Sequence, residues 1–259
     1  MDITTRTLTI VILVVAFAAL AVLTQFARRR RAAYPLRMIA AYEAIPLLIG
    51  ESIESARPFH VSFGSAGIGG LRTALALASA EMVVQTARRA AISPTAPLIT
   101  GSDASFLPLA GGALLRGYAA RGRADRVSPT SLRWIPALNG SSGSLAFAAA
   151  LTGMIGVERV SGSILVGTYG AEIALVLDAA TRGGRAVVAG SDNLVGQAVA
   201  YGMATTPLIG EEMFVAGAYL GDDAGTLAGA VATDTLRWLL VGGMIAAISF
   251  VIASRLAGG

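Results

Sequence analysis

The sequence predicts an α/β protein in which a parallel sheet forms the middle of the chain and one transmembrane helix lies at each end. Two observations support this class. Short apolar runs alternate with helical stretches through the middle of the chain, and most of them are followed by a glycine-containing turn. Long segments without charged residues lie near both termini. Strands joined by helices of this length pair in parallel, because each connection has to cross the sheet.

The two terminal segments, residues 7–27 and 238–254, are long enough to cross a bilayer. Neither contains a charged residue, and a helix rises about 1.5 Å per residue against a hydrocarbon core of ~30 Å. Four arginines, residues 28–31, directly follow the first segment, and such clusters stay on the cytoplasmic side. We therefore expect a two-pass protein of the cell membrane, with both termini outside and the central domain in the cytoplasm.

Charge and residue usage exclude several classes of function. The net charge of +4 arises beside the two terminal segments, whereas residues 32–234 hold more Asp and Glu than Arg, so no nucleic-acid partner is expected. The chain has no cysteine and no lysine, and its one histidine is His60. Thiol nucleophiles, Schiff bases and paired histidine ligands are therefore ruled out. We expect no catalytic residue, no metal site and no cofactor.

The central α/β domain is expected to span residues 58–206, between helical connectors at 32–57 and 207–234. Five of its segments have the short apolar or β-branched pattern of buried strands, and each precedes a turn and a helical stretch. These five predicted strands cover residues 59–63, 97–100, 131–136, 163–166 and 185–189.

The domain also contains an internal repeat. A strand, a glycine turn, a helix, a second strand and a Gly-Ser-Asp turn occur in this order at residues 59–121 and again at 160–204. The two Gly-Ser-Asp turns, Gly101–Asp103 and Gly190–Asp192, fall at equivalent places. A repeat of this length indicates an internal duplication rather than a solenoid, and we expect the two copies to superimpose.

Several short motifs are similar to those of an uncharacterised prokaryotic family of membrane-anchored proteins, whose central domain has no assigned function. The resemblance covers most of residues 38–220. It rests on Glu43–Pro46, Glu54–Pro58, Gly190–Asp192, Leu208–Glu212 and Ala216–Tyr219. Because the family has no assigned chemistry, the resemblance implies an architecture and no activity.

Glycine-rich turns that follow the strands are the best candidates for a binding site. In a Rossmann-like sheet such turns meet at the carboxyl edge, where bare backbone and helix N-termini can approach an anionic ligand. The spacing after the first strand does not fit G-x-G-x-x-G, and tight turns alone would also explain the glycines. The candidate ligand-binding residues are Gly64, Ser65, Gly67, Gly69, Gly70, Ser102, Asp103, Ser141, Ser142, Gly167, Thr168, Gly170, Ser191 and Asp192.

The serine and aspartate of the two Gly-Ser-Asp turns have a simpler interpretation than catalysis. Either side chain can cap the helix that follows, and the chain offers neither a lysine nor a second histidine as a base. We therefore favour helix capping for both turns.

Two functions remain open on the sequence alone. The favoured one is a membrane-anchored, non-catalytic module for self-assembly or partner binding, as a scaffold or an accessory subunit of a membrane complex. We expect a homo-oligomer, with helices around residues 74–91 and 145–154 as the self-contact. The alternative is a Rossmann-like domain that binds a nucleotide or another small anionic ligand, with or without enzymatic activity, tethered to the cytoplasmic face of the membrane.

Overall fold

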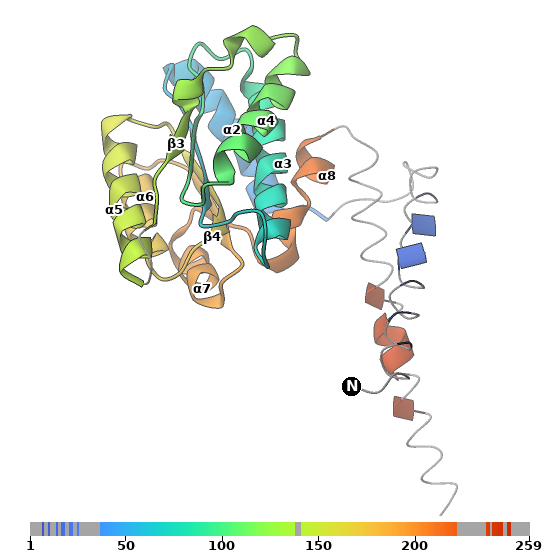
Figure 1. Cartoon of the computed structure of the whole chain (residues 1–259). Coiled ribbons are helices and arrows are strands. Elements are labelled where there is room, and N and C mark those ends of the chain that lie inside the picture. The colour runs from blue at the N-terminus through green and yellow to red at the C-terminus, as the bar shows by residue number, and fades with distance from the viewer. Residues whose placement is uncertain are drawn as a thin grey trace, which may run out of the picture. The chain divides into compact units, whose positions relative to one another are not determined.

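The structure is a computed structural model of the chain. It describes residues 37–137 and 141–221 continuously, and scattered helical positions within 7–25 and 237–249. Residues Arg37–Gly221 form one compact unit (Figure 1). The second unit, Met1–Leu36 with Asp222–Gly259, lies mostly outside the described residues.

A six-stranded parallel sheet forms the centre of the compact unit. The strand order is β3-β2-β1-β4-β5-β6, and every neighbouring pair is parallel. The chain therefore builds three strands outward from β1, crosses back over the sheet, and builds three more outward from β4. The strands are β1 (His60–Gly64), β2 (Leu98–Gly101), β3 (Leu132–Trp134), β4 (Ser163–Thr168), β5 (Val187–Ser191) and β6 (Thr206–Pro207).

The five predicted strands are all present, and their parallel pairing is confirmed. Every residue of β1, β2, β4 and β5 is buried, as expected for strands covered on both faces. The predicted number of five strands is wrong, because β6 adds a sixth at the edge. With two residues, β6 is too short to produce an alternating or apolar pattern.

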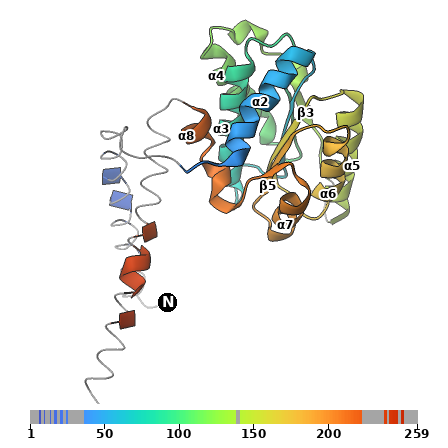
Figure 2. The same cartoon turned by 180° about the vertical axis from the view of Figure 1, so that it is seen from behind.

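Helices cover both faces of the sheet (Figures 1 and 2). One layer packs on Val61, Ile99 and Ile164, and the other packs on Leu98 and Leu165. The first layer contains α2 (Ala40–Ser55), α3 (Thr73–Ala90), α4 (Phe106–Ala119) and α8 (Ala216–Leu220), with the 3-10 turn Gly210–Phe214. The second contains α5 (Ser141–Val157), α6 (Ile173–Thr181) and α7 (Leu194–Met203).

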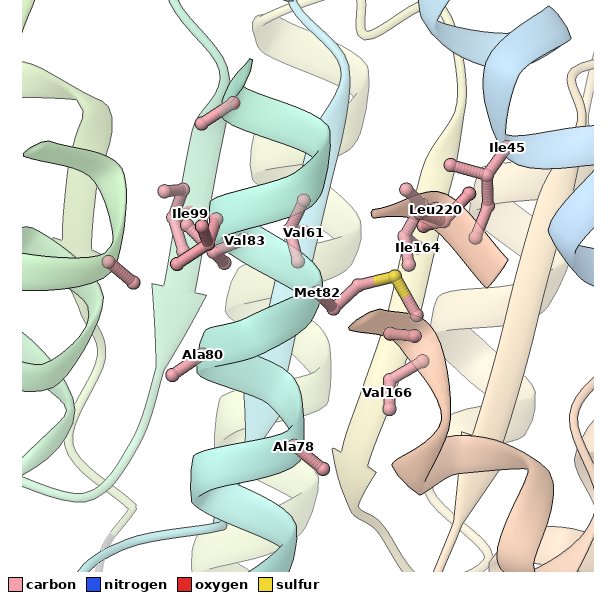
Figure 3. Close-up of a cluster of buried hydrophobic side chains, with 14 of the residues drawn as sticks. Ile45, Val61, Ala78, Ala80, Met82, Val83, Ile99, Ile164, Val166 and Leu220 are labelled. Atoms are coloured by element: carbon pink, nitrogen blue, oxygen red, sulfur yellow. The ribbon is translucent and has the colours of Figure 1, made fainter. Parts of the chain in front are cut away.

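Helix α3 forms the centre of the first layer. Met82, which is fully buried, points toward Ile164 and Val166 of β4 (Figure 3). Twelve of the 18 residues of α3 are buried, including Leu75. The predicted self-contact through residues 74–91 is therefore wrong for most of this helix, because its apolar side chains fill the core.

The first and last helices of the unit lie side by side (Figure 2). The rings of Tyr42 in α2 and Tyr219 in α8 are stacked, with centroids 4.8 Å apart. The Tyr219 hydroxyl donates to the carbonyl oxygen of Arg37 at 2.6 Å, and the Arg37 guanidinium pairs with Glu212. These contacts, which we call the terminal clasp, hold the two ends of the unit together, so α2 and α8 belong to the packed domain.

The structure contradicts the prediction of a transmembrane helix at each end. Within the described part of the chain, no helix is both long enough and apolar enough to cross a membrane. The longest helix there, α3, has 18 residues and carries Glu81, Arg88 and Arg89. The prediction of a two-pass membrane protein with a cytoplasmic domain is corrected accordingly. Most of residues 7–27 and 238–254 lie outside the described residues.

The topology agrees with the order of elements that suggested a duplication. Strands β1, β2 and β3 correspond to β4, β5 and β6, and the two Gly-Ser-Asp turns follow the equivalent strands β2 and β5. Superposition of residues 59–121 on 160–204 stays a prediction.

Candidate functional site

The predicted ligand-binding residues lie mostly at one edge of the sheet. Because all six strands are parallel, the turns after β1, β2, β4 and β5 come together at the carboxyl edge. Ser141 and Ser142 begin α5, but their side chains and residues 138–140 lie outside what the structure describes. The turns that the structure describes are bonded to one another in pairs.

The turns after β1 and β4 are in direct contact. The backbone N–H of Ser65 donates to the carbonyl oxygen of Thr168 at 3.0 Å, and the Ser65 hydroxyl donates to the same oxygen at 3.2 Å. A Cβ added to Gly64 would lie 2.3 Å from that oxygen, and one added to Gly167 would lie 2.0 Å from the Phe63 carbonyl oxygen. These two glycines are therefore required for the close approach of two turns.

The serines of the two Gly-Ser-Asp turns have equivalent partners. Ser102 donates to the Gly64 carbonyl oxygen through its N–H at 2.9 Å and its hydroxyl at 3.2 Å. The Ser191 hydroxyl donates to the Tyr169 carbonyl oxygen at 2.9 Å and accepts from the Tyr169 N–H at 3.0 Å. Each serine thus binds the turn that follows the neighbouring central strand.

The predicted helix capping by these turns is wrong. The residue that caps α7 is Asn193, whose side-chain oxygen accepts from the Val195 N–H at 2.9 Å. Helix α4 begins after Ser105, which provides no side-chain cap. Instead, each serine hydrogen-bonds to a different turn, and its partner is decided by which strands are neighbours in the sheet.

The two aspartates also hold turns in place. Asp103 accepts from the N–H of Ser105 at 2.8 Å, and a Cβ on Gly67 would lie 2.2 Å from the Asp103 carboxyl carbon. Asp192 accepts from the Thr168 hydroxyl at 3.1 Å. A third carboxylate, Glu172, accepts from the Gly170 N–H at 2.7 Å. Sequence reasoning missed Glu172, although a Gly-x-Glu turn is a local signal for such a contact.

Several backbone donors of the loop from Gly64 to α3 already have partners within the protein. The N–H groups of Gly69 and Gly70 both donate to the Thr73 hydroxyl, at 3.0 and 3.1 Å, and the Ile68 N–H donates to the Ser105 hydroxyl at 2.7 Å. Arg72 donates to the Ser65 hydroxyl at 3.0 Å. A phosphate would have to displace these contacts and approach three carboxylates, which disfavours an anion.

Two buried ionisable side chains lie beneath or within the sheet. Tyr169 is almost fully buried, and burial raises the pKa of its phenol above the ordinary value. His60 is fully buried in β1, its Nε2 lies 2.9 Å from the Thr100 hydroxyl, and burial lowers the pKa of its imidazole to about 3. Both are therefore neutral at pH 7, and neither reaches solvent. In the described part of the chain no group of three or more His, Asp or Glu could hold a metal ion.

Six parallel strands in this order, with helices on both faces, define a doubly wound α/β protein of the Rossmann type. The chain belongs to a family described as a domain of unknown function, DUF6754, which matches residues 2–257. No curated protein and no solved structure matches it. The expected resemblance to an uncharacterised family is confirmed, whereas its membrane-anchored part receives no support from this match.

Proposed function

We propose that the domain is a non-catalytic module that assembles with copies of itself through the outer surface of α5, α6 and α7. The observation that carries the proposal is the near absence of charge on this layer. Its three helices, of 17, 9 and 10 residues, contain a single charged residue, Asp178. By contrast, Glu or Arg side chains occur on α2, α3 and α4 alike.

Large apolar side chains are exposed along the same three helices. Leu194 and Tyr201 of α7 are 83% and 67% exposed, Val157 at the end of α5 is 81% exposed, and Leu175 of α6 is 46% exposed. Scattered exposed apolar residues are common, but a layer of helices that exposes many of them and carries little charge is typical of a contact surface. Between Leu145 and Val157 the outward positions of α5 are mostly alanine and glycine, which allow a partner to approach closely.

A second copy of the chain is the occupant that the charge distribution favours. A surface with so few charges can face itself with little repulsion between like charges, whereas docking on the α2–α3–α4 layer would desolvate glutamates and arginines. A two-fold symmetric contact uses the same patch on both subunits and therefore needs only this one surface. The predicted self-contact through residues 145–154 lies within it.

The mass of the purified full-length chain in solution tests this proposal. Leu194→Glu and Leu145→Glu introduce a charge that would have to be desolvated in the contact, and each should weaken association at least about tenfold. Leu47→Glu is the matched control, since Leu47 is 76% exposed on α2 in the opposite layer. A wild-type monomer, or equal loss of association in all three variants, would refute the proposal.

Disulfide trapping gives a second test, because the chain has no cysteine of its own. Ala149 is exposed in the middle of α5, so Ala149→Cys should form a cross-linked dimer under mild oxidation if two copies of α5 face each other. Leu47→Cys should not. Equal cross-linking of both variants would indicate random collision.

A further inference from the structure

A hollow at the opposite, amino-terminal edge of the sheet belongs to none of the contacts described above. It has a volume of about 260 Å³ and lies where β1, β2 and β3 begin, beside the end of α5. Pro58, Leu98 and Ser131 line it together with the charged side chains of Arg133 and Glu158. At ~30 Å³ per water molecule this volume holds about nine waters, so it suits only a small ligand.

Ser131 lines this hollow, but its hydroxyl oxygen is closed to solvent. The residue is only 4% exposed, and its hydroxyl has no hydrogen-bond partner among the described residues. A buried hydroxyl without a partner costs free energy, and here it is a feature of the wall rather than a contact for a ligand. Ile99 is paired with Leu132, and the residues that precede this pair, Leu98 and Ser131, both line the hollow.

The two charged residues are close enough to attract each other and too far apart for a strong pair. Arg133 Nη2 lies 4.0 Å from Glu158 Oε1, and both side chains are 41% exposed. A pair of this kind contributes little stability, so separating it for a ligand costs little. Glu158 directly follows the C-terminus of α5, where the helix dipole also favours a positive group.

We propose that this hollow binds a small zwitterion, an α-amino acid or a compound of the same chemistry. Its carboxylate pairs with Arg133, and its ammonium group pairs with Glu158. A simple anion would be attracted by Arg133 but repelled by Glu158. A simple cation would be attracted by Glu158 but repelled by Arg133. The requirement for both charges on one small molecule follows from the opposite signs of these two residues.

Thermal unfolding of the full-length chain with matched probes tests the site. The probes are the smaller L-amino acids, together with isovalerate and isobutylamine, which are L-valine without its ammonium group and without its carboxylate. At least one amino acid should raise the unfolding temperature saturably, and the single-charge compounds should not. If no amino acid does so, or if the single-charge compounds act equally well, the proposal is overturned.

Substitutions then assign the two charges. Arg133→Gln and Glu158→Gln should each weaken binding of the stabilising amino acid at least about tenfold. Arg182→Gln is the control, because Arg182 forms an exposed ion pair with Asp178 on α6, away from the hollow. Unchanged affinity in both Arg133→Gln and Glu158→Gln, while the unliganded proteins unfold as the wild type does, would place the ligand elsewhere and overturn the proposal.

Discussion

The buried imidazole of His60 makes a quantitative prediction about stability and pH. Its Nε2 interacts with Thr100, whereas Nδ1 has no hydrogen-bond partner among the described residues. Adding a proton would create a charge in the core without a counter-ion. Burial therefore lowers the pKa of His60 from 6.5 in the unfolded chain to about 3 in the folded one.

The sign of the effect follows from proton binding. Between pH 6.5 and pH 3 the unfolded chain binds a proton at His60 and the folded chain does not, so stability falls as the pH falls through the unfolded value. At pH 5 the loss of unfolding free energy is about 2 kcal/mol relative to neutral pH, since each pH unit below 6.5 contributes about 1.4 kcal/mol. This is a large part of the 5–15 kcal/mol typical of a folded domain.

Denaturant unfolding of the full-length protein and of His60→Gln, each at pH 7.5 and pH 5.0, measures this effect. The wild type should lose about 2 kcal/mol more than the variant between the two pH values, because glutamine does not titrate. Contributions from Asp and Glu are shared by both proteins and cancel in the comparison. A difference below ~0.5 kcal/mol would refute the assignment of a neutral, desolvated histidine. The chain has one histidine, so its imidazole resonances can be followed without ambiguity.

Three further predictions concern packing and the carboxyl edge. Leu75→Ala should cost ~2–5 kcal/mol of unfolding free energy, because Leu75 is only 2% exposed on α3. Leu77→Ala should cost less than ~0.5 kcal/mol, because Leu77 on the same helix is 53% exposed. Denaturant titration of the two variants measures the difference. Gly167→Ala should lower the melting temperature strongly, since the new methyl group meets the Phe63 carbonyl oxygen. Ser191→Ala should cost ~1–3 kcal/mol and speed amide exchange at Tyr169, whose N–H loses its acceptor. A Leu75→Ala, Gly167→Ala or Ser191→Ala variant as stable as the wild type would contradict the corresponding prediction.

The strands could be predicted from the sequence because they are buried on both faces. Val61 and Phe63 of β1, like Ile164 and Val166 of β4, make short apolar runs that end in glycine, and this pattern needs no knowledge of neighbours. The order of the strands in the sheet, by contrast, depends on which strands are neighbours. The rules for parallel connections predict a covered sheet, whereas the return from β3 to the far side of β1 is decided by packing across the whole domain.

The candidate site shows the same division between local and long-range information. The sequence predicted that the turns after β1 and β4 meet at the carboxyl edge, because that follows from parallel strands alone, whereas the predicted turn with Ser141 and Ser142 lies mostly outside the described residues. It did not predict that Ser102 would bind Gly64 or that Ser191 would bind Tyr169, since these partners are distant in sequence.

The terminal clasp makes the domain suited to circular permutation. Because Tyr219 reaches the backbone of Arg37, the chain enters and leaves the unit at one place, and a short linker could join residues 221 and 37. The exposed turn at Gly183 and Gly184, where both residues have positive φ, offers a site for new ends between α6 and β5. A permuted chain opened there would keep every strand intact. It would also carry its free ends on the α5–α6–α7 side of the sheet, where a fused reporter could sense whether that layer is covered.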